Sequence, residues 1–198
     1  MTDSRLRTPR QSEAIIADLM MPQHANGLRI PSVFGGVIMS MVDRCAALSA
    51  MRHAGGQATT LSIDRILFKE PIWVGELVEI RSRVVFVGNT SMAVLANVYA
   101  ENIAQGSRRH ANECWLTFVH LDAEGKPAAV PQLTLETADD RLLHEVAERR
   151  RAQSLAERRQ WTRPRTDRAC PRPGSPPPPL PRSPRTHGSP TAPRFFRP

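Results

Sequence analysis

The sequence predicts an α+β domain in which a curved antiparallel sheet wraps one long helix. Residues 35–53 contain no proline, and no glycine after the opening pair, and they place apolar side chains around the whole circumference of a helix. That pattern is typical of a buried helix. Downstream the apolar period changes from about 3.6 to 2, and four strand-like runs follow with short connections, as antiparallel strands do.

The segments before the central helix are less regular. Residues 11–20 (QSEAIIADLM) fit either a short amphipathic helix or a lead-in strand. Residues 23–32 contain Asn-Gly and a proline, which is the chemistry of a loop. Gly55 and Gly56 follow the apolar helix, and we expect them to end it.

The strands come next. The clearest is at residues 77–87 (LVEIRSRVVFV), where apolar and charged side chains alternate, as in a half-buried strand. Similar runs predict strands at residues 58–68, 91–100 and 113–121. We expect the polar stretch through GSRR to be a connection and DAEGKP to be the turn that closes the series.

The C-terminal part differs from the rest in composition. Residues 139–161 predict a charged amphipathic helix at the surface, with an apolar side formed by Leu142, Leu143, Val146 and Leu155. Residues 163–198 hold twelve of the eighteen prolines, and such a segment is expected to be disordered. The segment PPPPLPR within it is a linker or, alternatively, an SH3-type ligand. The predicted units are therefore a domain at residues 11–137, a helix at 138–161 and a tail at 162–198.

Charge and cysteine usage exclude several classes of protein. The tail carries eight arginines and one aspartate, so that subtracting its +7 from the +8 of the chain leaves +1 for the body, which argues against nucleic-acid binding. Cys45, Cys114 and Cys170 show no metal-ligand spacing and are expected to be reduced thiols. The sequence shows neither a signal peptide nor a run long enough to span a membrane, so the prediction is a cytoplasmic protein without membrane contact.

Several collinear motifs carry a resemblance to a known family. They are HAN at 24–26, SVFGGVIMSMVDRCAALSAMRHA at 32–54, ATTLSIDRILFKEPIWVGELVEI at 58–80, GNTSM at 88–92 and TFVHLDAEGKPAAVPQL at 117–133. Together they resemble the acyl-CoA thioester hydrolase family of the hotdog superfamily over about residues 20–135.

The resemblance implies a hotdog fold and hydrolysis of acyl-CoA to free fatty acid and CoA, in fatty acid metabolism. It also implies a site formed without metal or cofactor where two subunits join, in a homodimer, a dimer of dimers or a trimer of dimers. By position, Asp43 matches the catalytic carboxylate of the family and Asn26 its usual asparagine, while NTSM implies substrate contacts for Thr90 and Ser91. The family typically has the motif N-x-x-G-x-x-F-G-G. Here Phe34 lies eight residues after Asn26, so the alignment of Asn26 with the asparagine of the family is left open.

The residues themselves suit thioester hydrolysis. The reaction needs hydrogen-bond donors for an oxyanion and a group that deprotonates water or attacks directly. The N–H groups of Gly35 and Gly36 at the start of the helix suit the oxyanion, and Asp43 suits the second role. From residue 35 to residue 43 an α-helix rises about 12 Å, so one carbonyl group cannot touch both. Gly35 of one subunit and Asp43 of its partner are therefore expected to meet across a twofold interface.

Structural alternatives remain for each candidate. Asp43 can pair with Arg44 or Arg52, and Asn26 can belong to an ordinary Asn-Gly turn. A cross-strand role is the alternative to substrate contact for three hydroxyl side chains, those of Thr60, Thr90 and Ser91. Four arginines fit either the phosphates of CoA or solvated strand faces, namely Arg81, Arg83, Arg108 and Arg109.

Two other functions compete with hydrolysis. One is a non-catalytic hotdog module that binds acyl-CoA as a sensor and keeps the pocket without the chemistry. The other is a hotdog hydratase or dehydratase, which ordinarily places a histidine with the acid on or near the helix. His53 is ten residues beyond Asp43, so the sequence offers no such histidine close by.

Overall fold

The computed structural model describes residues 6–27, 29 and 32–161 of the 198-residue chain. The predicted tail, including PPPPLPR, lies outside these residues, and so does the side chain of Leu155. In the described part of the chain, no helix is long and apolar enough to cross a membrane.

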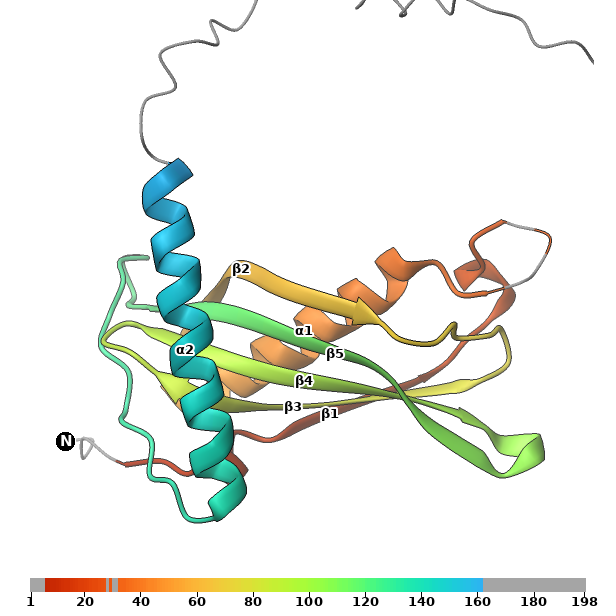
Figure 1. The fold of residues 1–198 in the computed structure, drawn as a ribbon, viewed down its shortest axis with the longest axis horizontal. Coiled ribbons are helices and arrows are strands. Elements are labelled where there is room, and N and C mark those ends of the chain that lie inside the picture. The colour runs from red at the N-terminus through yellow and green to blue at the C-terminus, as the bar shows by residue number, and fades with distance from the viewer. Residues whose placement is uncertain (1–5, 28, 30–31, 162–198) are drawn as a thin grey trace, which may run out of the picture. The chain divides into compact units, whose positions relative to one another are not determined.

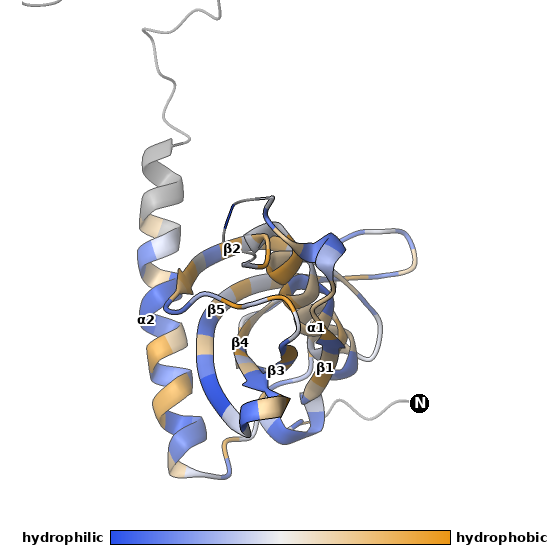
Figure 2. Ribbon diagram, turned by 90° about the vertical axis from the view of Figure 1, so that its right-hand side faces the viewer, coloured by the Kyte–Doolittle hydropathy of each residue, from blue (hydrophilic) through white to orange (hydrophobic). Residues whose placement is uncertain are grey.

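A five-stranded antiparallel sheet forms the body, with the strand order β1-β3-β4-β5-β2. Its strands are β1 (Ala14–Leu19), β2 (Gln57–Phe68), β3 (Leu77–Val87), β4 (Ser91–Asn102) and β5 (Ser107–Leu121). The sheet curls around helix α1 (Gly35–Ala54) (Figures 1 and 2). The buried apolar side chains of the helix and the sheet pack together in one core cluster. This arrangement confirms the predicted fold class.

The structure decides one open alternative and changes one expectation about the strands. Residues 14–19 form the edge strand β1, which pairs with β3 and is preceded by a short 3-10 helix at Pro9–Ser12. The last strand, β5, begins at Ser107, so the polar GSRR segment leads directly into a strand and is not only a connection. A tight turn at Ile103–Gln105 joins β4 to β5, and another 3-10 turn, Pro22–His24, precedes α1.

Helix α1 has the predicted limits but not the predicted burial. It begins after Phe34 and ends at Gly55, whose φ of 73° is the left-handed conformation that glycine adopts without strain. The side toward the sheet is fully buried, whereas Met39, Leu48 and Met51 are exposed. The expectation of a helix buried all round is therefore wrong for a single chain, because no element of the described chain covers this side.

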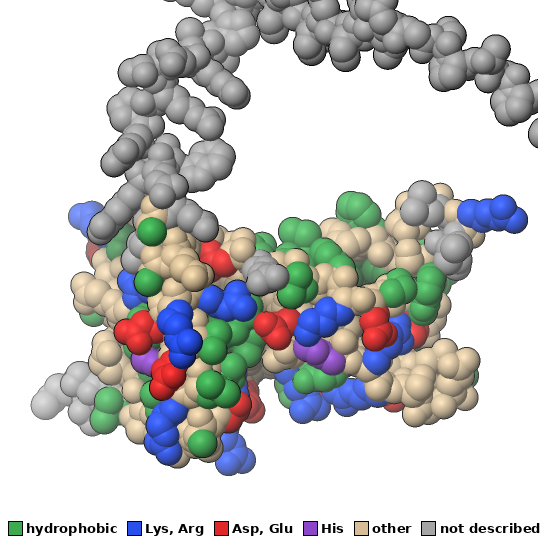
Figure 3. Space-filling model, in the orientation of Figure 1, with side chains coloured by type: hydrophobic (Ala, Val, Ile, Leu, Met, Phe, Trp, Pro, Cys, Tyr) green, Lys and Arg blue, Asp and Glu red, His purple; other side chains and the backbone are tan. Residues whose placement is uncertain are grey.

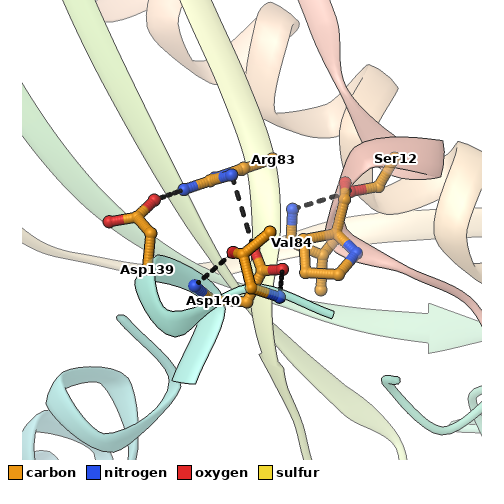
Figure 4. Close-up of polar contacts among 7 residues, drawn as sticks. Ser12, Arg83, Val84, Asp139 and Asp140 are labelled. Carbon is orange, nitrogen blue, oxygen red and sulfur yellow. Dashed lines mark hydrogen bonds and ion pairs between the residues drawn. The ribbon is translucent and has the colours of Figure 1, made fainter. Parts of the chain in front are cut away.

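Helix α2 (Ala138–Trp161) packs on the outer face of the sheet. A reciprocal capping box starts it: Thr137 N–H donates to Asp140, and Asp140 N–H donates to the Thr137 hydroxyl, both at 3.0 Å. Arg83 of β3 bonds Asp140 and the neighbouring Asp139, which ties the helix to the sheet (Figure 4).

The apolar side of α2 differs slightly from the prediction. Ala147 is buried, and Leu143 and Val146 pack beside it against a small cluster that contains Trp115. Leu142, which was expected on the same side, is 58% exposed. The helix rotates Leu142 toward solvent because Leu143, Val146 and Ala147 form the i, i+3, i+4 contact row.

A buried ion pair fixes the connection between β2 and β3. The carboxylate of Glu76 is 3% exposed and accepts two hydrogen bonds from Arg109, at 2.7 and 2.8 Å, and a third from the Trp73 N–H at 2.9 Å. Burial alone would raise the pKa of Glu76, but the hydrogen bonds from Arg109 and Trp73 outweigh it and lower that pKa. Arg109 therefore holds the loop against β5.

We predict that Arg109→Met lowers the free energy of unfolding by about 2–3 kcal/mol at pH 7, because it leaves a buried carboxylate unpaired. Arg81→Met, which removes an exposed guanidinium from the half-buried Glu79, should cost less than about 0.5 kcal/mol. Urea unfolding measures both. Equal losses would show that the Glu76 pair is no more important than a surface pair.

The same pair predicts a pH dependence. The pKa of Glu76 in the folded state lies below the unfolded value of about 4.3. The ionised Glu76 therefore contributes its full stabilisation of the folded state above that value, and this contribution is lost as pH falls through the lowered pKa. Urea midpoints between pH 7 and pH 3 should fall less steeply in Glu76→Gln than in the wild type. Identical slopes would contradict the assignment.

Candidate active site

Asp43 lies halfway along α1 on the side that the chain leaves uncovered. Its side chain is half-buried, and the hydroxyl of Thr60 on β2 donates to Asp43 Oδ1 at 2.7 Å. Neither Arg44 nor Arg52 pairs with it among the described residues: Arg44 bonds the Ser40 carbonyl, and Arg52 bonds a carbonyl of the N-terminal segment. The ion-paired alternative for Asp43 is therefore wrong, and the carboxylate keeps an oxygen available for chemistry.

The N-terminus of α1 presents free backbone donors. Phe34 N–H donates to the His24 carbonyl at 2.8 Å, and Val37 N–H donates to the Phe34 carbonyl at 2.9 Å. Between them, the N–H groups of Gly35 and Gly36 have no acceptor in the described part of the chain. Two adjacent N–H groups at the positive end of a helix form a site for an oxyanion.

Both glycines have an aromatic ring close to their backbone. A Cβ atom on Gly36 would lie 2.3 Å from the ring of Phe34, so that this exposed ring would have to move aside. A Cβ atom on Gly35 would lie 3.3 Å from the ring of Phe68, the last residue of β2. The Phe68 ring therefore lies directly on the backbone that carries the oxyanion donors, a contact that sequence periodicity could not show.

A cavity of about 370 Å³ opens beside this helix end. Its wall is mostly apolar and includes Val33, Gly35, Ile38, Phe68 and Ile72. It therefore suits an apolar chain whose polar end lies at the Gly35 N–H.

Asp43 does not line this cavity. Because α1 is one uninterrupted helix, the eight steps from residue 35 to residue 43 separate the two groups by about 12 Å along its axis. Within one chain the structure brings Asp43 to Thr60 and Gly35 to Phe68, but it does not bring Asp43 to Gly35. The Asp43–Thr60 contact was not foreseen, because it depends on how β2 lies on α1.

Asn26 lies in the loop that precedes α1. Its amide donates to the Ser32 hydroxyl at 2.5 Å, and its N–H donates to the Ser32 carbonyl at 2.9 Å. Gly27 beside it has a φ of 73°, as an Asn-Gly turn requires. The structure thus shows Asn26 shaping the loop that delivers the chain to Gly35.

Thr90 and Ser91 lie apart from Asp43, at the turn between β3 and β4. Thr60 pairs with Phe118, which pairs with Met92, so these three side chains point toward α1. Ser91 is next to Met92 and therefore points to the opposite face. Within one chain, Thr90 and Ser91 are not brought to the Asp43–Thr60 pair.

The four candidate arginines are all engaged with carboxylates. Arg81 and Arg108 bond Glu79, Arg109 bonds Glu76 and Glu70, and Arg83 bonds the start of α2. A role on a strand face, which was the alternative to binding the phosphates of CoA, accounts for each of these contacts.

Two other buried titratable side chains in the described part of the chain have shifted pKa values. Burial lowers the pKa of His53, and its Nε2 lies 2.9 Å from the Pro131 carbonyl, at the end of α1 farthest from Gly35. Burial raises the pKa of the Cys114 thiol to about 12, so this thiol stays protonated. Among residues 6–27, 29 and 32–161, no cluster of His, Cys, Asp and Glu could hold a metal ion.

Comparison with known proteins gives consistent matches. The Thioesterase superfamily model matches residues 31–107. An uncharacterized acyl-CoA thioester hydrolase of Bacillus subtilis is 35% identical over 150 residues, which cover 76% of this chain and 86% of that protein.

Solved structures match over a similar range. An acyl-CoA hydrolase of Staphylococcus aureus, in complex with butyryl coenzyme A, coenzyme A and coenzyme A disulfide, has a TM-score of 0.73 at 30% identity and covers 79% of this chain and 94% of its own. Variants of that hydrolase with an asparagine, a threonine or an aspartate changed to alanine have also been solved. An apo-hexameric acyl-CoA thioesterase has a TM-score of 0.74 at 34% identity, covering 80% of this chain and 99% of its own.

The helix wrapped by a curled five-stranded sheet is the hotdog architecture that the motifs imply. The identity to the Bacillus subtilis hydrolase extends over most of both chains. The chain therefore belongs to the acyl-CoA thioester hydrolase family of the hotdog thioesterase superfamily.

Proposed function

We propose that this protein hydrolyses acyl-CoA to free fatty acid and CoA, with Gly35 N–H of one subunit and Asp43 of its partner forming one site. The observation that carries the proposal is the pair of half-sites on one rigid helix, free N–H donors at its start and a carboxylate about 12 Å further on. The relatives named as acyl-CoA thioester hydrolases and the coenzyme A complexes of the Staphylococcus aureus hydrolase support acyl-CoA as the substrate.

In the proposed reaction the thioester carbonyl oxygen accepts hydrogen bonds from Gly35 N–H, with Gly36 N–H beside it. Asp43 removes a proton from water, which adds to the carbonyl carbon, or its carboxylate attacks that carbon first. On the first route the tetrahedral intermediate collapses, the C–S bond breaks and the proton taken from water goes to the CoA sulfur. On the second route the thiolate leaves first, and water then hydrolyses the acyl-aspartyl anhydride, releasing the fatty acid, restoring the Asp43 carboxylate and supplying the proton that the thiolate takes up. The Thr60 hydroxyl fixes the rotamer of Asp43 through its 2.7 Å bond and is thus a positioning residue.

We propose that a second subunit binds at the uncovered face. Exposed apolar side chains on α1 lie beside others on β2, which is an edge of the sheet and has Leu61 49% and Ile63 38% exposed. Hydrophobic side chains gather along this border of the molecule (Figure 3). A contiguous apolar surface with an unpaired strand edge suits a twofold interface between two copies. The hexameric thioesterase among the similar structures is compatible with three such dimers.

The other candidate residues take secondary roles in this proposal. Asn26 shapes the loop at the oxyanion site and is proposed to position the carbonyl or the attacking water. Ser91 faces away from Asp43 of its own chain and Thr90 precedes it at the turn, so we propose that both contact substrate held by a neighbouring subunit. The catalytic unit is proposed to be residues 11–137, followed by α2 and the tail.

Replacing Asp43 should remove the chemistry and leave the fold. We expect Asp43→Ala to lower kcat by about 10²-fold or more, because the water loses its base or the thioester its nucleophile. Thr60→Val should lower kcat by about 5- to 10-fold, since the carboxylate loses the bond that orients it. Thiol release from CoA measures both.

Thr59→Val is the matched control, since Thr59 is exposed on the other face of the same strand. It should retain the wild-type rate. Equal losses in the two threonine variants, or full activity in Asp43→Ala, would contradict the assigned roles. Acyl-CoA binding without thiol release by the wild type would instead indicate a sensor module.

Complementation between two variants tests whether the N–H donor and the carboxylate of one site come from different chains. Gly35→Pro removes the N–H, and proline fits here because residue 35 is the first of the helix and Phe34 has a ψ of 126°. Each single variant should be inactive, whereas mixed refolding of Gly35→Pro with Asp43→Ala should restore activity in heterodimers, with at most about half of their sites intact. Heterodimers verified by mass without activity above the single variants would exclude the shared site.

A further inference from the structure

Asn112 on β5 is a buried amide without a partner. Its side chain is 0% exposed, and neither Nδ2 nor Oδ1 has a hydrogen-bond partner in the described part of the molecule. Buried amides are nearly always hydrogen-bonded, since leaving one unpaired costs about 1–3 kcal/mol. The stability of the domain alone gives no reason for an asparagine here.

Its position connects it to the oxyanion site. In the sheet register Asn112 pairs with Phe68 of β2 on one side and with Val98 of β4 on the other, so the three side chains share the face toward α1. The Phe68 ring in turn lies on Gly35, 3.3 Å from where a Cβ atom would be. Side chains paired in this way have Cβ atoms about 5 Å apart, so Asn112 lies just behind the ring that borders the Gly35 N–H.

Phe68 is the movable element between them. It is the last residue of an edge strand, its side chain is 53% exposed, and it borders the cavity of about 370 Å³. Ile38, one turn beyond Gly35, is 2% exposed and lines the same cavity. Ser32, Lys69 and Glu70 also line this cavity, but Asn112 is the fully buried polar side chain behind the Phe68 ring, and an acyl chain whose carbonyl lies at Gly35 would meet it where that ring moves aside.

We propose that Asn112 is a specificity-determining residue that recognises a hydroxyl group on the acyl chain, a proposal that rests on the acyl-CoA hydrolysis proposed above. The chemistry of the two unpaired atoms selects the ligand. Nδ2 needs an acceptor and Oδ1 needs a donor, and a hydroxyl group supplies both, whereas a keto oxygen satisfies only the amide donor and a methylene satisfies neither. A hydroxyacyl group within the first few carbons of the thioester fits the short path from Gly35 to Asn112.

The test compares hexanoyl-CoA with 3-hydroxyhexanoyl-CoA and 5-hydroxyhexanoyl-CoA in thiol-release assays. For at least one hydroxyacyl substrate, Asn112→Leu, which keeps the side-chain shape and removes both polar atoms, should lose about tenfold in kcat/KM relative to hexanoyl-CoA. Asn112→Thr, which keeps a hydroxyl, should retain part of the preference. Cys114→Ala, two residues along on the same buried face, should leave the ratio unchanged.

An unchanged ratio in Asn112→Leu overturns the proposal. A melting temperature that stays the same or falls in that variant would also overturn it, because it would show that an internal water or a structural contact already satisfies the amide. If the wild type hydrolyses none of the three compounds, the proposed function fails separately. Calorimetric binding of the same three compounds to wild type and Asn112→Leu then decides the specificity proposal alone, with the same tenfold criterion.

Discussion

The length of one rigid helix limits where the candidate site of this molecule can form. Helix α1 has free N–H donors at its first residues and a carboxylate at residue 43, and an uninterrupted helix holds these groups about 12 Å apart. No side-chain rotation closes that distance. Under the proposed mechanism a single chain therefore holds two half-sites, and we propose that a second chain completes them through the exposed apolar side of α1 and the edge strand β2.

The elements could be predicted where the information is local. The apolar circumference of residues 35–53 and the alternation in 77–87 depend on neighbours in sequence, and both elements form as expected. What covers the helix depends on the assembly, so periodicity could not show that Met39, Leu48 and Met51 are exposed in one chain. The sequence likewise could not show that Arg109, which resembles a loop residue, lies in a strand and neutralises Glu76.

The candidate site also combines features that the local sequence marks with features that depend on how distant segments pack. Asp43 and the two glycines are marked by their spacing on one helix, together with the family motifs that flank them. The bond from Thr60 to Asp43 and the packing of Phe68 on Gly35 depend on how β2 crosses the helix, which no local pattern encodes. Two buried polar side chains also contrast: Glu76 has its charge satisfied by three hydrogen bonds, whereas Asn112 has none. The unpaired amide of Asn112 beside Phe68 is the observation on which the proposed recognition of a hydroxyl group rests.

A crystal structure of the assembled protein with a thioether analogue of acyl-CoA tests the central claim most directly, because the analogue cannot be hydrolysed and marks the position of the scissile bond. The shared-site account predicts that the carbon attached to sulfur lies within contact of Gly35 N–H of one chain and of the Asp43 carboxylate of its partner. An analogue bound with both groups from the same chain, or bound away from the start of α1, would contradict it.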